Sequence, residues 1–260
     1  MKFDDPAYSE EDPRIAIVTA AFDAAGGLYG HRRVRRMLQD QGIFHSRKTV
    51  NKLLKQAGRH CQLRRKRFHT AQRGKRYATC ENIVDRDFQR EAPNMLWLTD
   101  LTTFHVAGRL VYLSAIKDVY NGEIVAHSIS ASPSPGLVVN TFKQALKGRL
   151  IGTDLIVHSD QGVQYTSRSF VGYLEEAGIT QSMSRKGNCL DNAPMESFFG
   201  HMKDDLGRRR QFETLAELTQ TIQEYIYYYN YQRRQERLGG MSPIQFRNHH
   251  YPSKPGILNT

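Results

Sequence analysis

The chain of 260 residues is 39% hydrophobic and 24% charged, a composition typical of a globular protein with a substantial core and room for one smaller domain. No apolar run is long enough to cross a bilayer, and the acidic start lacks the basic and apolar segments of a secretion signal. We therefore expect a cytoplasmic protein without a membrane partner. Cys61, Cys80 and Cys189 form no close pair, which argues against a disulfide framework and against a zinc knuckle.

The net charge of +11 is concentrated in one segment. Residues 31–76 contain 16 Lys or Arg and a single acid, Asp40, whereas the rest of the chain has a small excess of acids. A solvated basic face is the ordinary explanation of such a run. At this density, however, the charge favours a polyanionic partner.

Three short helices are predicted in this part of the chain, at about residues 15–26, 30–42 and 46–57, with Ser46 as the N-cap of the third. The third helix has an apolar face and a polar face, and the polar face consists of Arg47, Lys48, Asn51, Lys52 and Lys55. A helix-turn-helix whose second helix is basic and bears an amide can read a DNA major groove, so these residues are candidate DNA contacts. The alternative is an ordinary amphipathic helix with a solvated basic face.

From Met95 onward the pattern becomes period two. Three strands joined by short turns are predicted at 96–106, 109–119 and 123–130, as an antiparallel meander. A helix to about Leu150 follows, and after it come a strand at 154–158, a helix at 167–177, a strand at 179–183, a helix beginning near Asn192 and a long helix at 215–231. This order predicts an α/β fold with a mixed five-stranded sheet flanked by helices, preceded by a small all-α domain.

The changes in composition divide the chain into four segments. We expect a helical, helix-turn-helix-like DNA-binding domain at 1–62, a basic linker at 63–92, a core domain with C-terminal helices at 93–250 and a tail at 251–260. The arginine-rich linker could also touch phosphates.

Three carboxylates stand at the edges of the predicted elements. Asp100 lies in the first strand, Asp160 just beyond the fourth strand, and Glu196 in the first turn of the helix that begins near Asn192. Mg²⁺ and Mn²⁺ prefer such oxygen ligands, and two ions roughly 3.5 to 4 Å apart can support an in-line phosphoryl transfer without a covalent protein intermediate. Lys203, two helical turns after Glu196, could hold a DNA phosphate close to the metals.

Each of these acids also has a simpler explanation, as a surface charge, a turn residue or a charge at a helix N-terminus. Asp118, Asp154 and Asp191 compete for the same role. For Asp100, Asp160 and Glu196, however, the position, the spacing and the flanking elements agree independently, which favours a metal site.

Two strings make the chain recognisable. Residues 158–167 read HSDQGVQYTS and residues 182–199 read SMSRKGNCLDNAPMESFF. Together they resemble the OrfB transposases of two-frame bacterial insertion sequences, which belong to the retroviral-integrase superfamily and have an RNase H-like core. The resemblance covers nearly the whole chain, because residues 30–50 are similar to the family's helix-turn-helix segment and residues 97–100 to the start of its catalytic core.

The resemblance implies an RNase H-like DDE integrase core in which Asp100, Asp160 and Glu196 are the catalytic metal ligands. The implied cofactors are two divalent ions, Mg²⁺ or Mn²⁺. Lys203 matches the family's basic position seven residues after the glutamate. Two further basic residues in the preceding loop, Arg185 and Lys186, join the candidate DNA contacts.

The resemblance also implies the reaction, which is cleavage at the ends of an insertion sequence followed by attack of the exposed 3′-hydroxyl on another DNA strand. Family members commonly pass through a circular DNA intermediate. The implied partners are double-stranded DNA, as element terminal repeats and as target, together with further copies of the chain on that DNA. The protein of the upstream reading frame, free or as a frameshift fusion, is another partner. The implied location is the bacterial cytoplasm, at the nucleoid when DNA is bound.

One departure from the family pattern lies near the C-terminus, where residues 233–237 read RRQER and lack the family-typical histidine. Two alternative functions stay open, a DNA-binding regulator without catalysis and a metal-dependent nuclease of the RNase H-like superfamily. A tyrosine-nucleophile recombinase is a further rival because several tyrosines crowd residues 225–231, although aromatic packing explains them more simply.

Overall fold

The computed structural model describes residues 12–27, 29–59, 79–147, 149, 151–207 and 210–251. The chain divides into two compact units, one formed by Met1–Leu63 with Gln235–Gly240 and the other by Arg64–Arg234 with Met241–Thr260. Cys61, residues 63–78 of the predicted linker and residues 252–260 of the predicted tail lie outside the described residues. The domain limits predicted from the sequence stay predictions.

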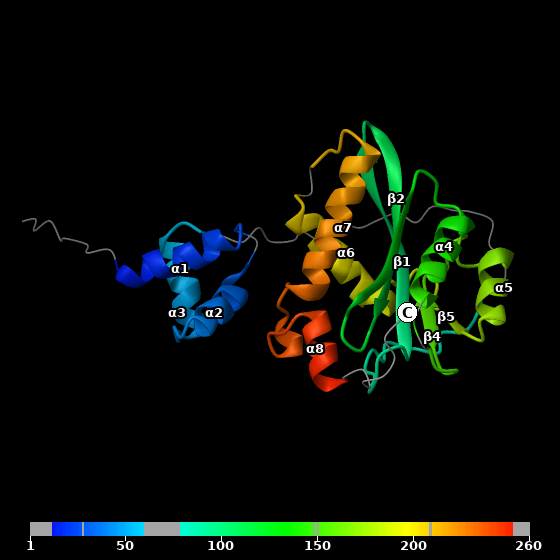
Figure 1. Ribbon diagram of the computed structural model, residues 1–260, viewed down its shortest axis with the longest axis horizontal. Helices are drawn as coiled ribbons and strands as arrows, with labels where there is room; N and C mark the ends of the chain where they lie inside the picture. Colours follow the sequence, from blue (N-terminus) through cyan, green and yellow to red (C-terminus); the bar gives the residue numbers. More distant parts are fainter. Residues whose placement is uncertain are drawn as a thin grey trace, which may run out of the picture. The chain divides into compact units, whose positions relative to one another are not determined.

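Three helices build the first unit: α1 (Pro13–Ala24), α2 (His31–Asp40) and α3 (Arg47–Gln56) (Figure 1). Their buried apolar residues recur at helical spacing and include Val18, Phe22, Val34, Leu38, Val50, Leu53 and Leu54. At the start of α3 the Ser46 hydroxyl accepts a hydrogen bond from the Thr49 amide at 3.0 Å. The three predicted helices and the Ser46 cap are confirmed. A short 3₁₀ helix, η2 (Glu236–Leu238), also belongs to this unit.

The second unit contains a mixed sheet of five strands in the order β3-β2-β1-β4-β5. The strands are β1 (Leu96–Val106), β2 (Arg109–Asp118), β3 (Ile124–Ser130), β4 (Ile156–Ser159) and β5 (Thr180–Met183). The first three form an antiparallel meander, β4 runs parallel to β1, and β5 runs parallel to β4. The mixed sheet and the meander are as predicted. The fourth strand begins later than predicted because Thr153 and Asp154 form a turn.

Helices cover both faces of the sheet (Figure 1). On one face lie α4 (Pro135–Leu146) and α5 (Arg168–Glu176), and on the other lie α6 (Ala193–Asp205) and α7 (Leu215–Tyr231). The first of these stops short of its predicted limit because the backbone at Lys147 is extended. Two elements of this unit escaped prediction, the 3₁₀ helix η1 (Cys189–Asn192) and α8 (Pro243–His250), and the short η2 of the first unit escaped it as well. A capping box of Ser242 and Gln245 starts α8. Within the described ranges, no helix has the length and apolar character that a membrane crossing requires.

The two faces of the sheet carry separate cores. Leu96 and Leu98 of β1 pack with residues of α6 and α7, whereas Trp97 packs with residues of α4 and α5. Successive residues of a strand point to opposite faces. Asp100 therefore lies on the face of Leu98, which is the face that α6 covers.

We predict that Asp118 makes the protein less stable as the pH rises from about 4 to about 6. Its carboxylate is buried at the end of β2, and burial raises its pKa to about 6, although the Asn94 and Tyr120 amides donate to it at 2.7 and 2.9 Å. The folded state therefore holds this proton more tightly than the unfolded chain, whose ordinary value is 3.8. The stabilising contribution is complete below that ordinary value and is lost as the pH rises through the folded value.

The loss corresponds to about two pKa units, or on the order of 3 kcal/mol. Denaturant unfolding across this pH range measures it, and Asp118→Asn should flatten the pH dependence. Asp154→Asn is the matched control, because Asp154 is an exposed acid. An unchanged slope in Asp118→Asn would show that this carboxyl is not the source.

Candidate active site

Asp100 and Asp160 lie on neighbouring strands at the same level of the sheet. The parallel pairing of β1 with β4 sets Leu98 opposite His158. β4 ends at Ser159, and the same register continued by two residues sets Asp160 beside Asp100. Both side chains therefore leave the sheet toward the face that α6 covers.

A backbone amide accompanies each of these carboxylates. Asp100 Oδ1 accepts from the Leu101 amide at 2.7 Å, and Asp160 Oδ1 accepts from the Gly162 amide at 2.8 Å. A Cβ at position 162 would lie 2.9 Å from Asp160 Oδ1 and would also collide with the side-chain amide of Gln164. A side chain at this position would therefore displace the ends of the Asp160 and Gln164 side chains.

Glu196 comes from the first turn of α6, and polar contacts tie the start of this helix to the sheet. The Asn192 side-chain amide donates to the Thr99 carbonyl on β1 at 3.2 Å, and Lys117 Nζ on β2 donates to the Pro194 carbonyl at 3.1 Å. The apolar face predicted for this helix is Met195, Phe198, Met202 and Leu206, of which the first three are fully buried and the last is partly buried. The helix is thereby fixed beside the strand that carries Asp100.

The charges of the site influence one another. Burial raises the pKa of Asp100 well above its ordinary value, the carboxylates of Asp160 and Glu196 raise it further, and the ammonium of Lys203 lowers it. That ammonium lies 5.5 Å from the centroid of the Phe104 ring, on the same strand as Asp100. Three acids and one cation thus share one electrostatic environment.

The chemistry of this donor set fits a divalent cation. All three acids supply hard oxygen ligands from rigid elements, and a cation would relieve the repulsion that raises the pKa of Asp100. In the part of the chain that the structure describes, no three His, Cys, Asp or Glu residues are close enough together to form a complete metal site. A bound ion would accordingly have to draw the carboxylates closer to one another.

Tyr165 backs the site from within the core. Its ring is fully buried, and its hydroxyl lies 3.3 Å from Thr99 Oγ1, which in turn donates to the Ala115 carbonyl at 3.1 Å. Burial, together with the charges of Asp100 and Asp160, raises the pKa of Tyr165 well above its ordinary value. The phenol therefore stays neutral and supports the floor beneath the two aspartates.

The competing acids have other surroundings. Asp118 is buried at the end of β2 with its two backbone amides, and Asp154 is exposed in the turn before β4. Asp191 is fully buried between Arg86 and Arg185. None of these three influences the pKa of Asp100 in the way that Asp160 and Glu196 do.

His158 and Ser159 do not form a nucleophile pair. The two ring nitrogens of His158 lie 2.9 and 3.0 Å from the hydroxyls of Ser182 and Ser184, and burial lowers its pKa to about 4. The Ser159 hydroxyl donates to the carbonyl of Asp160. The tyrosines of α7 divide between packing and surface, since Tyr225 and Tyr229 are buried whereas Tyr227 and Tyr231 are exposed.

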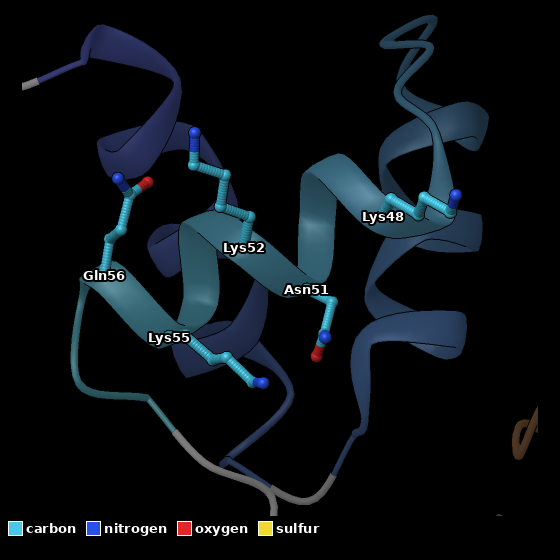
Figure 2. Close-up of a pocket in the computed structure, with 5 residues that line it drawn as sticks. All are labelled: Lys48, Asn51, Lys52, Lys55 and Gln56. Atoms are coloured by element: carbon cyan, nitrogen blue, oxygen red, sulfur yellow. The ribbon is translucent and has the colours of Figure 1, made fainter.

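The predicted DNA contacts of the first unit share one face of α3. Lys48, Lys52 and Lys55 are exposed and Asn51 is partly exposed. Together with Gln56, which the prediction omitted, they line an open concavity of about 460 Å³. Figure 2 shows their side chains projecting from successive turns of the helix. The remaining predicted contact, Arg47, pairs with Glu236 of the same unit at 2.6 Å.

The two predicted contacts in the loop before α6 differ from each other. Lys186 is exposed. Arg185 is half exposed but bonds to Asp191 and also pairs with Asp85 at 3.0 Å. Its guanidinium is thus engaged within the protein.

Sequence reasoning missed several residues that shape the site. Tyr165 and Asn192 lie inside the two strings that carry the family resemblance, so their neighbourhood was visible although their roles were not. Lys117 carried a different signal, because a lysine interrupts the apolar run at the end of β2. Its buried position shows that the interruption has a structural purpose.

Family models match most of the chain. Residues 9–67 match an HTH-like domain, and residues 90–189 and 196–251 match an integrase core domain. The putative transposase InsK for insertion sequence element IS150 of Escherichia coli is 40% identical over 244 residues, which cover 94% of this chain and 85% of that protein. The transposase for insertion sequence element IS904 of Lactococcus lactis is 36% identical over 233 residues, covering 89% and 92%.

An uncharacterized transposase-like protein of Haemophilus influenzae is 42% identical over 217 residues, covering 84% of this chain and 92% of its own. Among solved structures, a chain of the simian T-cell lymphotropic virus intasome in complex with PP2A regulatory subunit B56 gamma matches with a TM-score of 0.51 at 14% identity, over 87% of this chain and 74% of that one. That likeness concerns the fold and agrees with the predicted RNase H-like architecture. The chain belongs to the OrfB-type transposases of bacterial insertion sequences, which join an HTH-like domain to an integrase core domain.

Proposed function

We propose that this protein is a DDE transposase that cleaves DNA at the ends of an insertion sequence and joins the exposed 3′-hydroxyl to another strand. Asp100, Asp160 and Glu196 hold two divalent ions, Mg²⁺ or Mn²⁺. The observation that carries the proposal is the parallel register of β1 with β4, which sets Asp160 beside Asp100. Contacts of Asn192 and Lys117 fix the start of α6, and with it Glu196, against the same sheet. Membership of the insertion-sequence transposases supports the reaction class.

Each residue of the proposed site would have its own role. When bound, the ions would supply activation of the attacking oxygen and stabilisation of the leaving oxygen. Asp100 and Asp160 would present their carboxylates from paired strands, and Glu196 would close the site from α6. Lys203 would hold a DNA phosphate beside them. Because no side chain acts as the nucleophile, the protein would never become covalently attached to DNA.

Recognition of the terminal repeats is assigned to α3. Lys48, Lys52 and Lys55 are exposed at spacings of three and four residues, as required for contacts with successive phosphates. The amides of Asn51 and Gln56 lie among these ammonium groups and could pair with adenine in the major groove (Figure 2). The apolar residues that pack α3 into the unit lie on the opposite face, so the polar face is not needed for packing.

The partners follow from the reaction. The substrates are double-stranded DNA carrying the terminal repeats and a target duplex. Because two ends must be joined to one target, we propose that two or more copies of the chain act together on DNA. The protein of the upstream frame, alone or as a fusion, would contribute further DNA contacts.

The metal site is tested by Asp100→Asn, Asp160→Asn and Glu196→Gln. Each should reduce cleavage and strand transfer more than about a hundredfold. Mutation of a residue that only hydrogen-bonds to a metal ligand already costs about 10–100-fold in metal affinity or activity, and loss of a ligand itself should cost more. The assay uses DNA with the cognate ends and Mg²⁺, and chelation should abolish activity of the unaltered protein. Without metal, Asp100→Asn should also raise the melting temperature, because it removes a carboxyl whose ionised form is disfavoured by burial and by the charges of Asp160 and Glu196.

The control is Asp154→Asn, which changes an exposed acid in the turn before β4 and should keep full activity. A covalent protein–DNA adduct would favour the tyrosine recombinase instead. DNA binding without cleavage in the unaltered protein would favour the regulator, and cleavage without joining would favour the nuclease.

Gly162→Ala should lower activity without unfolding the protein. The added Cβ would approach Asp160 Oδ1 to 2.9 Å and would collide with the side-chain amide of Gln164, so the two side chains that form the turn must shift. We expect a loss of about tenfold to a hundredfold in strand transfer. Gly172→Ala in α5 is the matched control, since nothing lies within 4 Å of the added atom, and it should be neutral or slightly stabilising. Equal activities of the two variants would contradict the role of this turn.

The α3 surface is tested by Lys52→Ala and Asn51→Ala. Lys52→Ala should weaken binding to all DNA sequences alike and reduce the slope of log affinity against log salt by about 1. Asn51→Ala should weaken binding to the terminal repeat by roughly 1–3 kcal/mol and leave binding to unrelated DNA nearly unchanged. Lys143→Ala on α4 removes an exposed lysine of the other unit and is the control. Binding unaffected by both α3 variants would exclude this helix as the reader.

A further inference from the structure

Asp191 is a buried carboxylate that the proposed chemistry does not use. It lies in η1, directly before α6. Arg185 donates to it from Nε and from Nη2, both at 3.0 Å, and also from its backbone amide at 3.0 Å. Arg86 Nε donates at 2.7 Å and the Asn82 side-chain amide at 3.1 Å. The carboxylate is therefore surrounded by donors from two other segments of the chain.

This arrangement keeps Asp191 ionised in the interior. Its side chain has no exposed area, and a buried carboxylate is costly unless charges and hydrogen bonds compensate it. Hydrogen bonds from Arg185, and after them those from Arg86, hold the pKa of Asp191 well below its ordinary range. Loss of either guanidinium would leave the group incompletely compensated.

The segment that supplies Arg86 has an unusual backbone. Asp85 and Arg86 have φ values of 40° and 66°, so two successive non-glycine residues are left-handed. Such backbone is strained and persists only where surrounding contacts hold it. The Asn82 side chain accepts from the Asp85 amide at 2.9 Å while its amide donates to Asp191. The strained turn thus directs the Arg86 guanidinium to this one carboxylate.

The ion cluster adds a third attachment to the start of α6. Asn192 bonds to β1, and Lys117 on β2 bonds to the Pro194 carbonyl. Asp191 ties the same turn to the segment before β1 and to the loop after β5. Glu196 follows immediately, in the first turn of the helix. Its position relative to Asp100 is consequently set by these attachments and not by the sheet alone.

We propose that Asp191, together with Arg86 and Arg185, is a positioning group that sets the reach of Glu196 toward the metal ligands on β1 and β4. The inference rests on the proposed function, because it assigns Glu196 to metal binding. It also explains why Arg185 is engaged within the protein. Without the cluster, the first turn of α6 would move more freely and the ions would be held more weakly.

A comparable ion pair at the other end of the same helix provides the control. Asp205 accepts from Arg233 Nη2 at 2.6 Å and from the Tyr225 hydroxyl at 3.0 Å, and both members of the ion pair are nearly buried. Its loss should destabilise α6 without loosening the turn that carries Glu196. A variant of Asp205 therefore shows what loss of helix stability alone does, without a change in the position of Glu196.

The experiment compares Asp191→Asn and Arg86→Ala with the control Asp205→Asn and the reference Glu196→Gln, all in the full chain. Mn²⁺ affinity is measured by electron paramagnetic resonance titration without DNA, and hydrogen exchange is followed at the start of α6 without metal. We expect Asp191→Asn and Arg86→Ala to weaken Mn²⁺ binding by about 10–100-fold and to speed exchange in residues 189–197. Asp205→Asn should lower the melting temperature and keep the Mn²⁺ affinity.

Mn²⁺ affinity equal to that of the unaltered protein in Asp191→Asn and Arg86→Ala would overturn the inference, as would an equal loss in Asp205→Asn. If Asp191→Asn does not fold, Arg86→Ala decides, because that side chain is 44% exposed and its removal leaves no cavity. Failure of the unaltered protein to bind Mn²⁺, or undiminished affinity in Glu196→Gln, would overturn the proposed function itself. The two failures are thereby distinguishable.

Discussion

The parallel pairing of β1 with β4 is the constraint on which the candidate site depends. With Leu98 opposite His158, the aspartates two residues further on leave adjacent strands on the same face. A slip of one residue would send Asp160 to the opposite face, because side chains alternate along a strand. The alternation of β4 prevents such a slip, since Ile156 packs against the core under α6 and Val157 belongs to the core under α4 and α5. Hydrophobic packing on both faces therefore sets the geometry of two charged groups.

The third carboxylate reaches the site by other means. Glu196 stands on a helix whose N-terminus carries partial positive charge, and the buried Lys117 ammonium lies at the same end, 5.7 Å from the Phe198 ring. Positive charge is thus gathered at the end of the helix that carries this carboxylate. A buried lysine is costly by itself, but here its ammonium anchors the helix through the Pro194 carbonyl.

Local patterns predicted most of the fold. Period-two runs and the Asn121-Gly122 turn are enough for the meander, and Ser46 with its apolar stripe is enough for α3. The helix α8 escaped prediction because it has only eight residues and a weak apolar pattern. The capping box of Ser242 and Gln245, with Pro243 after the cap, is nevertheless a helix-start signal that the sequence contains.

The attachments of α6 escaped for a different reason. Lys117 meets Pro194 across 77 residues and Asn192 meets Thr99 across 93, and no spacing rule connects positions so far apart. Arg185 illustrates the same limit, since its charge indicates a DNA contact whereas its position places it on Asp191. The three candidate ligands could be found because each occupies the edge of a predictable element. The residues that position them could not, because their partners are defined only by the tertiary fold.

The distribution of charge links metal loading to DNA entry. The basic excess lies in residues 31–76, whereas the candidate site gathers three carboxylates whose repulsion already raises the pKa of Asp100. A DNA phosphate brought to that site without metal ions would meet like charge, which Lys203 opposes in part. Under the proposed function, bound divalent ions would reverse the local sign, so metal and DNA would each favour binding of the other. A basic segment that attracts duplex DNA of any sequence would thus coexist with an acidic site that would accept a phosphate only once metal ions are bound.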